Sequence, residues 1–99
     1  MEFRWNAEKD FWLRTERGIS FDEVVIQLQA GRILATRKHH NADRFAHQEI
    51  YFVDIKAYVY MVPFVRDKEW IFLKTVIPTR KGVREFLSAL KPDSPGAES

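Results

Sequence analysis

Residues 50 to 77 read IYFVDI-KA-YVYMVPFV-RDKE-WIFLKTVI, in which three strand-like runs are separated by two short turns. The runs are Ile50–Ile55, Tyr58–Val65 and Trp70–Ile77. Because short turns join antiparallel neighbours, we expect a three-stranded meander with Tyr58–Val65 in the middle. Pro63 lies inside the middle run and has no N–H to donate, so it requires an edge position or a bulge there.

Two helices are predicted upstream of the meander, each with a recognisable start. Asn6 can cap a helix that runs to about Arg17, and Gly18 suits the left-handed residue that ends such a helix. Ser20 and Glu23 have the spacing of a capping box, in which each side chain bonds the backbone N–H of the other residue. The second helix therefore begins at Ser20.

The remaining elements complete the predicted order. Gly31 ends the second helix, and short alternating runs at 2–5 and 33–36 predict two further strands, with a polar loop over 37–48. Apolar residues at i, i+3, i+4 and i+7 predict a C-terminal helix; they are Val83, Phe86, Leu87 and Leu90. The order β-α-α-β-β-β-β-α describes an α+β fold: a small, mostly antiparallel sheet with two N-terminal helices and one C-terminal helix.

The length of 99 residues fits one domain, which we place at 1–91, followed by a disordered tail at 92–99. Large aromatic side chains are expected to dominate the core; those assigned to it are Trp5, Phe11, Phe21, Phe64 and Phe86. The absence of cysteine excludes structural disulfides, thiolate metal sites and a cysteine nucleophile.

The formal net charge is +2, but the positive charge is concentrated in one part of the chain. Residues 66–91 contain seven Lys or Arg and three Asp or Glu, a balance that suits a polyanionic partner. A solvated charged face explains the same composition. The first fifteen residues are too highly charged for a signal-peptide core, and no apolar run reaches the ~20 residues that span a bilayer, so we expect a cytoplasmic protein without a membrane partner.

Several short segments, in order along residues 3–90, resemble the BrnT-like toxins. FRWNAEK at 3–9 resembles the F-x-W-x-x-x-K start of that family, and GISFDEV at 18–24 resembles the entry to its second helix. The similarity continues through VPFV at 62–65, IFLKT at 71–75 and PTRK at 78–81. One departure lies in the loop, where His40 stands in place of the proline of an H-P-N pattern.

The resemblance implies a fold like that of the RelE and ParE toxins and a role as the toxin of a bacterial type II toxin–antitoxin system. Such a toxin is expected to inhibit growth as a metal-independent endoribonuclease that needs no cofactor. Its partners would be RNA, either free or associated with the ribosome, and a cognate antitoxin protein that neutralises it. The alternatives are a non-enzymatic RNA- or protein-binding module and a degenerate toxin that retains only antitoxin binding.

Metal-free RNA cleavage requires a base for the 2′-hydroxyl, cations for the phosphorane and an acid for the leaving oxygen. Lys74 is the leading candidate cation, because it interrupts an apolar strand and points with Phe72 and Val76. An exposed strand lysine without a role is the alternative reading. Arg80 and Lys81 oppose the dipole of the helix that they begin, so a phosphate ligand would explain them, as would an ion pair with Glu85 or with an acidic residue elsewhere.

Three histidines lie in the predicted loop, where His is the natural acid or base near neutral pH. His39 is the candidate; the alternatives are His40, His47 or exposed histidines without a role, and the spacing of the three disfavours a metal site. Tyr60 can stack on a base or pack in the sheet. The candidate catalytic residues are Lys74, Arg80 and His39, and the candidate RNA-binding residues are Lys81, Arg84, Arg37, Lys38, Arg44 and Tyr60.

Overall fold

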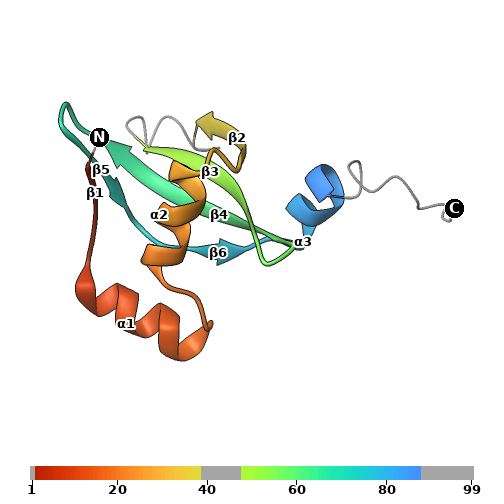
Figure 1. The fold of residues 1–99 in the computed structure, drawn as a ribbon, viewed down its shortest axis with the longest axis horizontal. Helices are drawn as coiled ribbons and strands as arrows, with labels where there is room; N and C mark the ends of the chain where they lie inside the picture. Colours follow the sequence, from red (N-terminus) through yellow and green to blue (C-terminus); the bar gives the residue numbers. More distant parts are fainter. Residues whose placement is uncertain (1, 39–47, 88–99) are drawn as a thin grey trace, which may run out of the picture.

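The computed structural model describes residues 2–38 and 48–87. Its elements, in chain order, are β1 (Glu2–Trp5), α1 (Ala7–Glu16), α2 (Phe21–Gln29), β2 (Ile33–Lys38), β3 (Gln48–Ile55), β4 (Tyr58–Arg66), β5 (Trp70–Leu73), β6 (Ile77–Pro78), α3 (Arg80–Gly82) and the π-helical turn η1 (Val83–Leu87). The strands form one sheet in the order β1-β5-β4-β3-β2, and β6 also pairs with β4. Figure 1 shows α2 crossing the sheet and α3 at the end where β3 turns into β4.

The α+β class and the predicted meander are confirmed. β3 and β5 both pair antiparallel with β4, with Ile50 opposite Pro63 and Phe64 opposite Leu73. The first strand was predicted without a partner, and it lies parallel to β5 at the edge of the sheet. The run 70–77 is not one strand, because it stops at Leu73 and resumes as β6. Within the part of the chain that the structure describes, the sheet therefore has six strands rather than five and is mostly antiparallel.

Pro63 explains where that interruption falls. β4 is a central strand, so Pro63 does not lie at an edge of the sheet as a whole. Its C=O accepts a hydrogen bond from the backbone N–H of Lys74 at 2.8 Å. The N and C=O groups of one strand residue face the same neighbour, so the missing N–H of Pro63 also faces this side. Because Pro63 has no N–H to return to the C=O of Lys74, the ladder with β5 stops at this point, and pairing with β4 resumes at β6.

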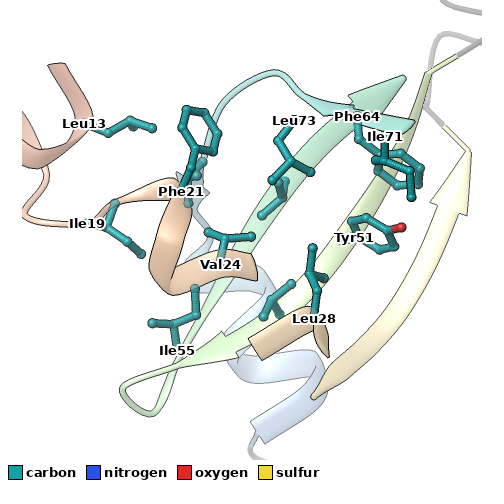
Figure 2. Packing of buried hydrophobic residues seen from close by; sticks show 13 residues of the cluster. Leu13, Ile19, Phe21, Val24, Leu28, Tyr51, Ile55, Phe64, Ile71 and Leu73 are labelled. Atoms are coloured by element: carbon teal, nitrogen blue, oxygen red, sulfur yellow. The ribbon is translucent and has the colours of Figure 1, made fainter. Parts of the chain in front are cut away.

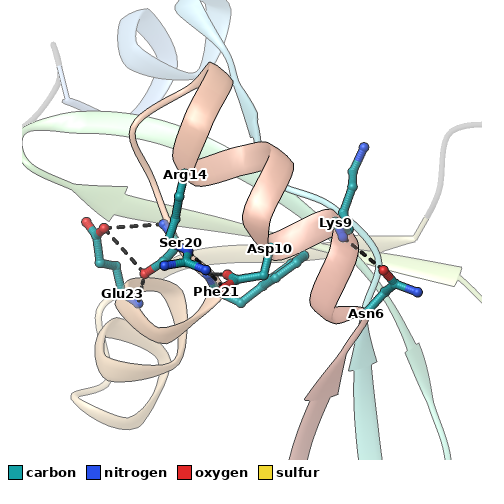
Figure 3. Close-up of polar contacts among 7 residues, drawn as sticks. All are labelled: Asn6, Lys9, Asp10, Arg14, Ser20, Phe21 and Glu23. Carbon is teal, nitrogen blue, oxygen red and sulfur yellow. Dashed lines mark hydrogen bonds and ion pairs between the residues drawn. The ribbon is translucent and has the colours of Figure 1, made fainter.

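Both N-terminal helices begin at the predicted caps (Figure 3). The Asn6 side chain accepts from the N–H of Lys9 at 2.8 Å, and Ser20 and Glu23 form the complete capping box. Asp10 on α1 accepts from the N–H of Phe21 at 2.8 Å, so one carboxylate also fixes the start of α2 against α1. The contact between Asp10 and Phe21 therefore fixes the two helices relative to each other.

The main core lies between these helices and one face of the sheet, here called the covered face (Figure 2). Leu13, Phe21, Val24, Phe64 and Leu73 are each 0% exposed. The assignment of Phe11 to the core is wrong, because its side chain is 65% exposed. Phe11, Trp12 and Leu13 are consecutive, so they point in different directions around α1, and Leu13 is the one that reaches the core.

The opposite face of the sheet, here called the second face, carries a smaller apolar cluster. Its buried members are Ile50, Phe52, Val59 and Leu87, with Met61, Val83 and Phe86 packed against them. Phe86, assigned to the core from the sequence, belongs to this cluster and is only partly buried. Trp5, another assigned core residue, packs against the covered-face cluster, also partly buried. α3 and η1 thus cover one end of the second face.

The predicted disordered tail at 92–99 and the predicted continuation of the C-terminal helix through Leu90 lie outside the described residues. Among the residues that are described, no helix is long and apolar enough to cross a membrane.

Candidate functional site

Lys74 lies just beyond β5, on the second face of the sheet. Ile71 and Leu73 belong to the covered-face core, so Phe72 between them points to the second face. The Nζ atom of Lys74 is 5.9 Å from the centroid of the Phe72 ring, which places the lysine on the same side. Its expected alignment with Val76 is wrong, because the strand stops at Leu73 and Val76 turns into the covered-face core. Lys74 remains exposed.

Arg37 joins the end of β2 to the C-terminal helical segment. Its guanidinium carbon lies 5.0 Å from the centroid of Phe52 and 5.1 Å from that of Phe86. The same guanidinium donates to both carboxylate oxygens of Glu85, with Nη1 and Oε1 3.3 Å apart. The hydrogen bond to Arg37 lowers the pKa of Glu85 below its ordinary value of 4.5 and raises that of Arg37. Arg37 therefore ties η1 to the sheet.

A small pocket of about 190 Å³ opens beside this pair. Its floor is apolar and its rim carries both signs of charge; the lining residues are Arg37, Phe52, Met61, Thr79, Lys81, Gly82 and Glu85. A Cβ atom on Gly82 would lie 2.7 Å from Thr79 Cγ2 and 2.8 Å from Val59 Cγ1, distances that real Cβ atoms do not show. Glycine at this position therefore lets α3 approach β4 closely.

Arg80 and Lys81 are exposed on the first turn after β6. The side chain of Thr79 caps this turn by accepting from the N–H of Gly82 at 3.1 Å. Arg80 and Lys81 do not form the ion pair with Glu85 that was considered as an alternative. The carboxylate of Glu85 pairs with Arg37 instead. Among the described residues, no acidic partner lies within 4 Å of the charged groups of Arg80, Lys81, Arg84 or Lys74.

The two leading catalytic candidates occupy different positions along β4. The N–H of Lys74 donates to Pro63, and that of Thr79, next to Arg80, donates to Val59 at 3.0 Å. Pro63 and Val59 are separated by about 14 Å of strand, at roughly 3.4 Å per residue. The backbones of Lys74 and Arg80 are thus on one side of the molecule but not adjacent. Only extended side chains would bring both charges to one phosphate.

The other predicted site residues are more dispersed. Tyr60 packs against the covered-face core, on the opposite side of the sheet from Lys74, and contacts Tyr58 edge-on at 5.7 Å. Lys38 is exposed at the end of β2, opposite Glu49 in the ladder, and Arg84 is exposed on η1. His39, Arg44, His40 and His47 lie outside the described residues.

A row of aromatic and basic side chains on the second face was not anticipated. Trp70 and Phe72 are neighbours on this face of β5, with ring centroids 6.4 Å apart. The guanidinium carbon of Arg4, from the adjacent β1, lies 5.4 Å from the Trp70 ring. The sequence held part of this signal, since two aromatic residues and a lysine at i, i+2 and i+4 of a strand share a face. The parallel pairing of β1 with β5, which brings Arg4 next to Trp70, could not be predicted from the sequence.

Comparison of the chain with models of protein families, with curated protein sequences and with solved structures found no match.

Proposed function

We propose that this protein is the toxin of a type II toxin–antitoxin system, related in fold to the RelE and ParE toxins and acting by metal-independent cleavage of RNA. One observation carries the proposal: basic side chains gather on the sheet face that α1 and α2 do not cover. Arg4, Lys74, Arg37 and Lys81 lie on or beside this face, together with the rings of Phe52, Trp70 and Phe72. Cations interleaved with aromatic rings suit single-stranded RNA, which offers phosphates and unstacked bases.

In this proposal Lys74 and Arg80 supply the positive charge that stabilises the phosphorane. Both are exposed, and neither has an acidic partner within 4 Å among the described residues, so their charge is available to a ligand. His39 would act as the acid or base. In the sequence it follows Lys38, the last residue of β2, and Lys38 in turn follows Arg37, which lies on the second face. Lys81 and Arg84 would bind flanking phosphates, and Lys38 and Arg44 are proposed as further RNA-binding residues.

The proposed protein partner is a cognate antitoxin. It would keep the toxin inactive by covering this basic face with an acidic or amphipathic segment. The location of the protein in the cytoplasm belongs to the same proposal.

Single-turnover cleavage of a short RNA by refolded, antitoxin-free protein, with direct binding measured in parallel, tests this function. Lys74→Ala and Arg80→Ala are each expected to reduce the rate by about a hundredfold while binding changes less, because a donor aimed at developing charge contributes mainly in the transition state. His39→Ala is expected to flatten the pH–rate profile. Failure of the wild-type protein to cleave RNA, with or without ribosomes, would remove the enzymatic claim.

A non-enzymatic RNA-binding module is the second candidate, and the spacing of Lys74 and Arg80 favours it. Backbone attachment points set about 14 Å apart along β4 suit contacts with two separate phosphates of an extended strand better than contacts with one reacting phosphate. For such a module Lys74→Ala and Arg80→Ala would weaken affinity uniformly and lower the slope of log K against log salt by about 0.7 each. Equal losses in rate and in affinity for both variants would decide for binding alone.

A further inference from the structure

We propose that Trp70 and Phe72 form a stacking platform for two consecutive bases of single-stranded RNA, with the phosphate between or beside them held by Lys74. This platform lies on β5 and shares no residue with the pocket beside Arg37 and Glu85. It rests on the proposed function for its ligand, RNA, but requires no cleavage. A base-binding site at this position gives a specific role to two aromatic residues that take no part in the proposed cleavage step.

The geometry of the two rings fits this role. Trp70 and Phe72 alternate with the buried Ile71 and Leu73, so both must project from the second face of the sheet. Their centroids are 6.4 Å apart and their planes meet at 74°, so the rings meet edge to face and are not stacked on each other. Both side chains are partly exposed despite their size. Sheets that bind single-stranded RNA use aromatic residues in this way, one ring for each splayed base.

The charges around the platform differ between its two ends. At one end Lys74 has no acidic partner within 4 Å among the described residues, and its Nζ lies 5.9 Å from the Phe72 ring. At the other end Arg4 lies over Trp70 but donates to Glu2 from Nε at 3.0 Å. Asp67 and Glu69 also raise the pKa of Arg4, after the larger effect of its hydrogen bond to Glu2. A phosphate is therefore attracted to the Lys74 end, while Glu2 opposes binding at the Arg4 end.

The other exposed tryptophan provides the contrast that makes the assignment specific. Trp12 on α1 is 41% exposed and has Lys9 and Arg17 over its ring, at 4.4 and 4.8 Å. These cations lie closer than those over Trp70 and Phe72, at 5.4 and 5.9 Å, so they shield the Trp12 ring more closely from a base. No second aromatic ring stands beside Trp12 at the spacing of a neighbouring base within the described contacts.

Binding can be measured without cleavage by the full chain and a fluorescein-labelled single-stranded 2′-O-methyl RNA of eight nucleotides, which has no 2′-hydroxyl nucleophile. Fluorescence anisotropy should show that Trp70→Ala and Phe72→Ala each weaken binding roughly tenfold, the usual contribution of one stacked base. Trp12→Ala is the matched control and should bind as the wild type does. Trp70→Phe keeps a ring and should retain most of the affinity, which separates stacking from any effect on folding.

A variant that should gain affinity completes the test. Glu2→Gln removes the carboxylate that holds Arg4, so the guanidinium becomes available to a phosphate and the salt slope should steepen by about 0.7. Wild-type affinity in Trp70→Ala and Phe72→Ala, or an equal loss in Trp12→Ala, would overturn the platform. A third outcome would also overturn it: the Trp70 and Phe72 variants could lose a co-purifying protein while their RNA binding stays unchanged. In that case the two aromatic residues would form a protein-docking surface. If the protein binds RNA through Trp70 and Phe72 but does not cleave it, this inference holds and only the proposal of enzymatic activity is removed.

Discussion

The two faces of the sheet differ in how completely they are covered. α1 and α2 seal the covered face, where Leu13, Phe21 and Phe64 are inaccessible to solvent. Among the described residues, the second face is covered by the short α3 and η1 at one end, and its cluster is smaller and less deeply buried. Trp70 and Phe72 project from this face without being enclosed. The contrast indicates that one face supplies most of the stability of this small domain, while the other is available to a ligand.

The largest expected effect is the loss of a side chain from the covered face. Phe21 is fully buried and stacks on Trp5 at 5.6 Å, so Phe21→Ala should lower the free energy of unfolding by about 3–5 kcal/mol. Phe86, on the second face, is partly buried, and Phe86→Ala should cost about 2 kcal/mol. Urea denaturation of both variants measures the difference. Equal losses would show that the two faces contribute alike.

A smaller effect is expected where α3 approaches β4. Gly82→Ala places a methyl group against Thr79 and Val59, and overpacking of this kind costs about 1–3 kcal/mol. Lys81→Ala, at the exposed neighbouring position, is the control and should change stability by less than about 0.5 kcal/mol. If thermal melting shows no difference between the two variants, α3 is not packed on the sheet as described.

The smallest effect concerns the ion pair of Arg37 and Glu85, both of which are exposed. Because Arg37 lowers the pKa of Glu85 in the folded protein, the pair stabilises the fold fully above the ordinary carboxyl pKa of 4.5. That contribution is lost as the pH falls through the lower folded pKa. The stability difference between wild type and Glu85→Gln should therefore be present at neutral pH and disappear in acid. A difference that grows on acidification would contradict the pair.

The sequence predicted local features well and non-local ones poorly. Caps at Asn6 and Ser20 and the β3–β4–β5 meander depend on residues close in the chain, and all are present. The parallel pairing of β1 with β5 joins segments about 70 residues apart and leaves no local pattern. Phe11 was misassigned because three consecutive apolar residues on α1 do not reveal which of them faces the sheet.

In the candidate site, too, local features could be predicted from the sequence and non-local ones could not. Alternation placed Lys74 on the face of Phe72, and the same rule would have placed Trp70 there. The role of Arg37 could not be foreseen, because Glu85 lies 48 positions away in the sequence and Phe52 and Phe86 come from different elements. Tyr60 was grouped with the basic residues on its chemistry, and its strand position directs it to the opposite face.

The central claim is that RNA binds the second face of the sheet and not the helices on the covered face. A titration of the labelled protein with the eight-nucleotide 2′-O-methyl RNA, followed by amide chemical shifts in NMR spectra, tests this claim most directly. The largest shifts are expected in β5, in β1 and around Lys74, with smaller ones near Arg37 and Lys81 and none in the exposed parts of α1 and α2. Shifts concentrated on α1 around Phe11 and Trp12, or no shifts at any RNA concentration, would contradict it.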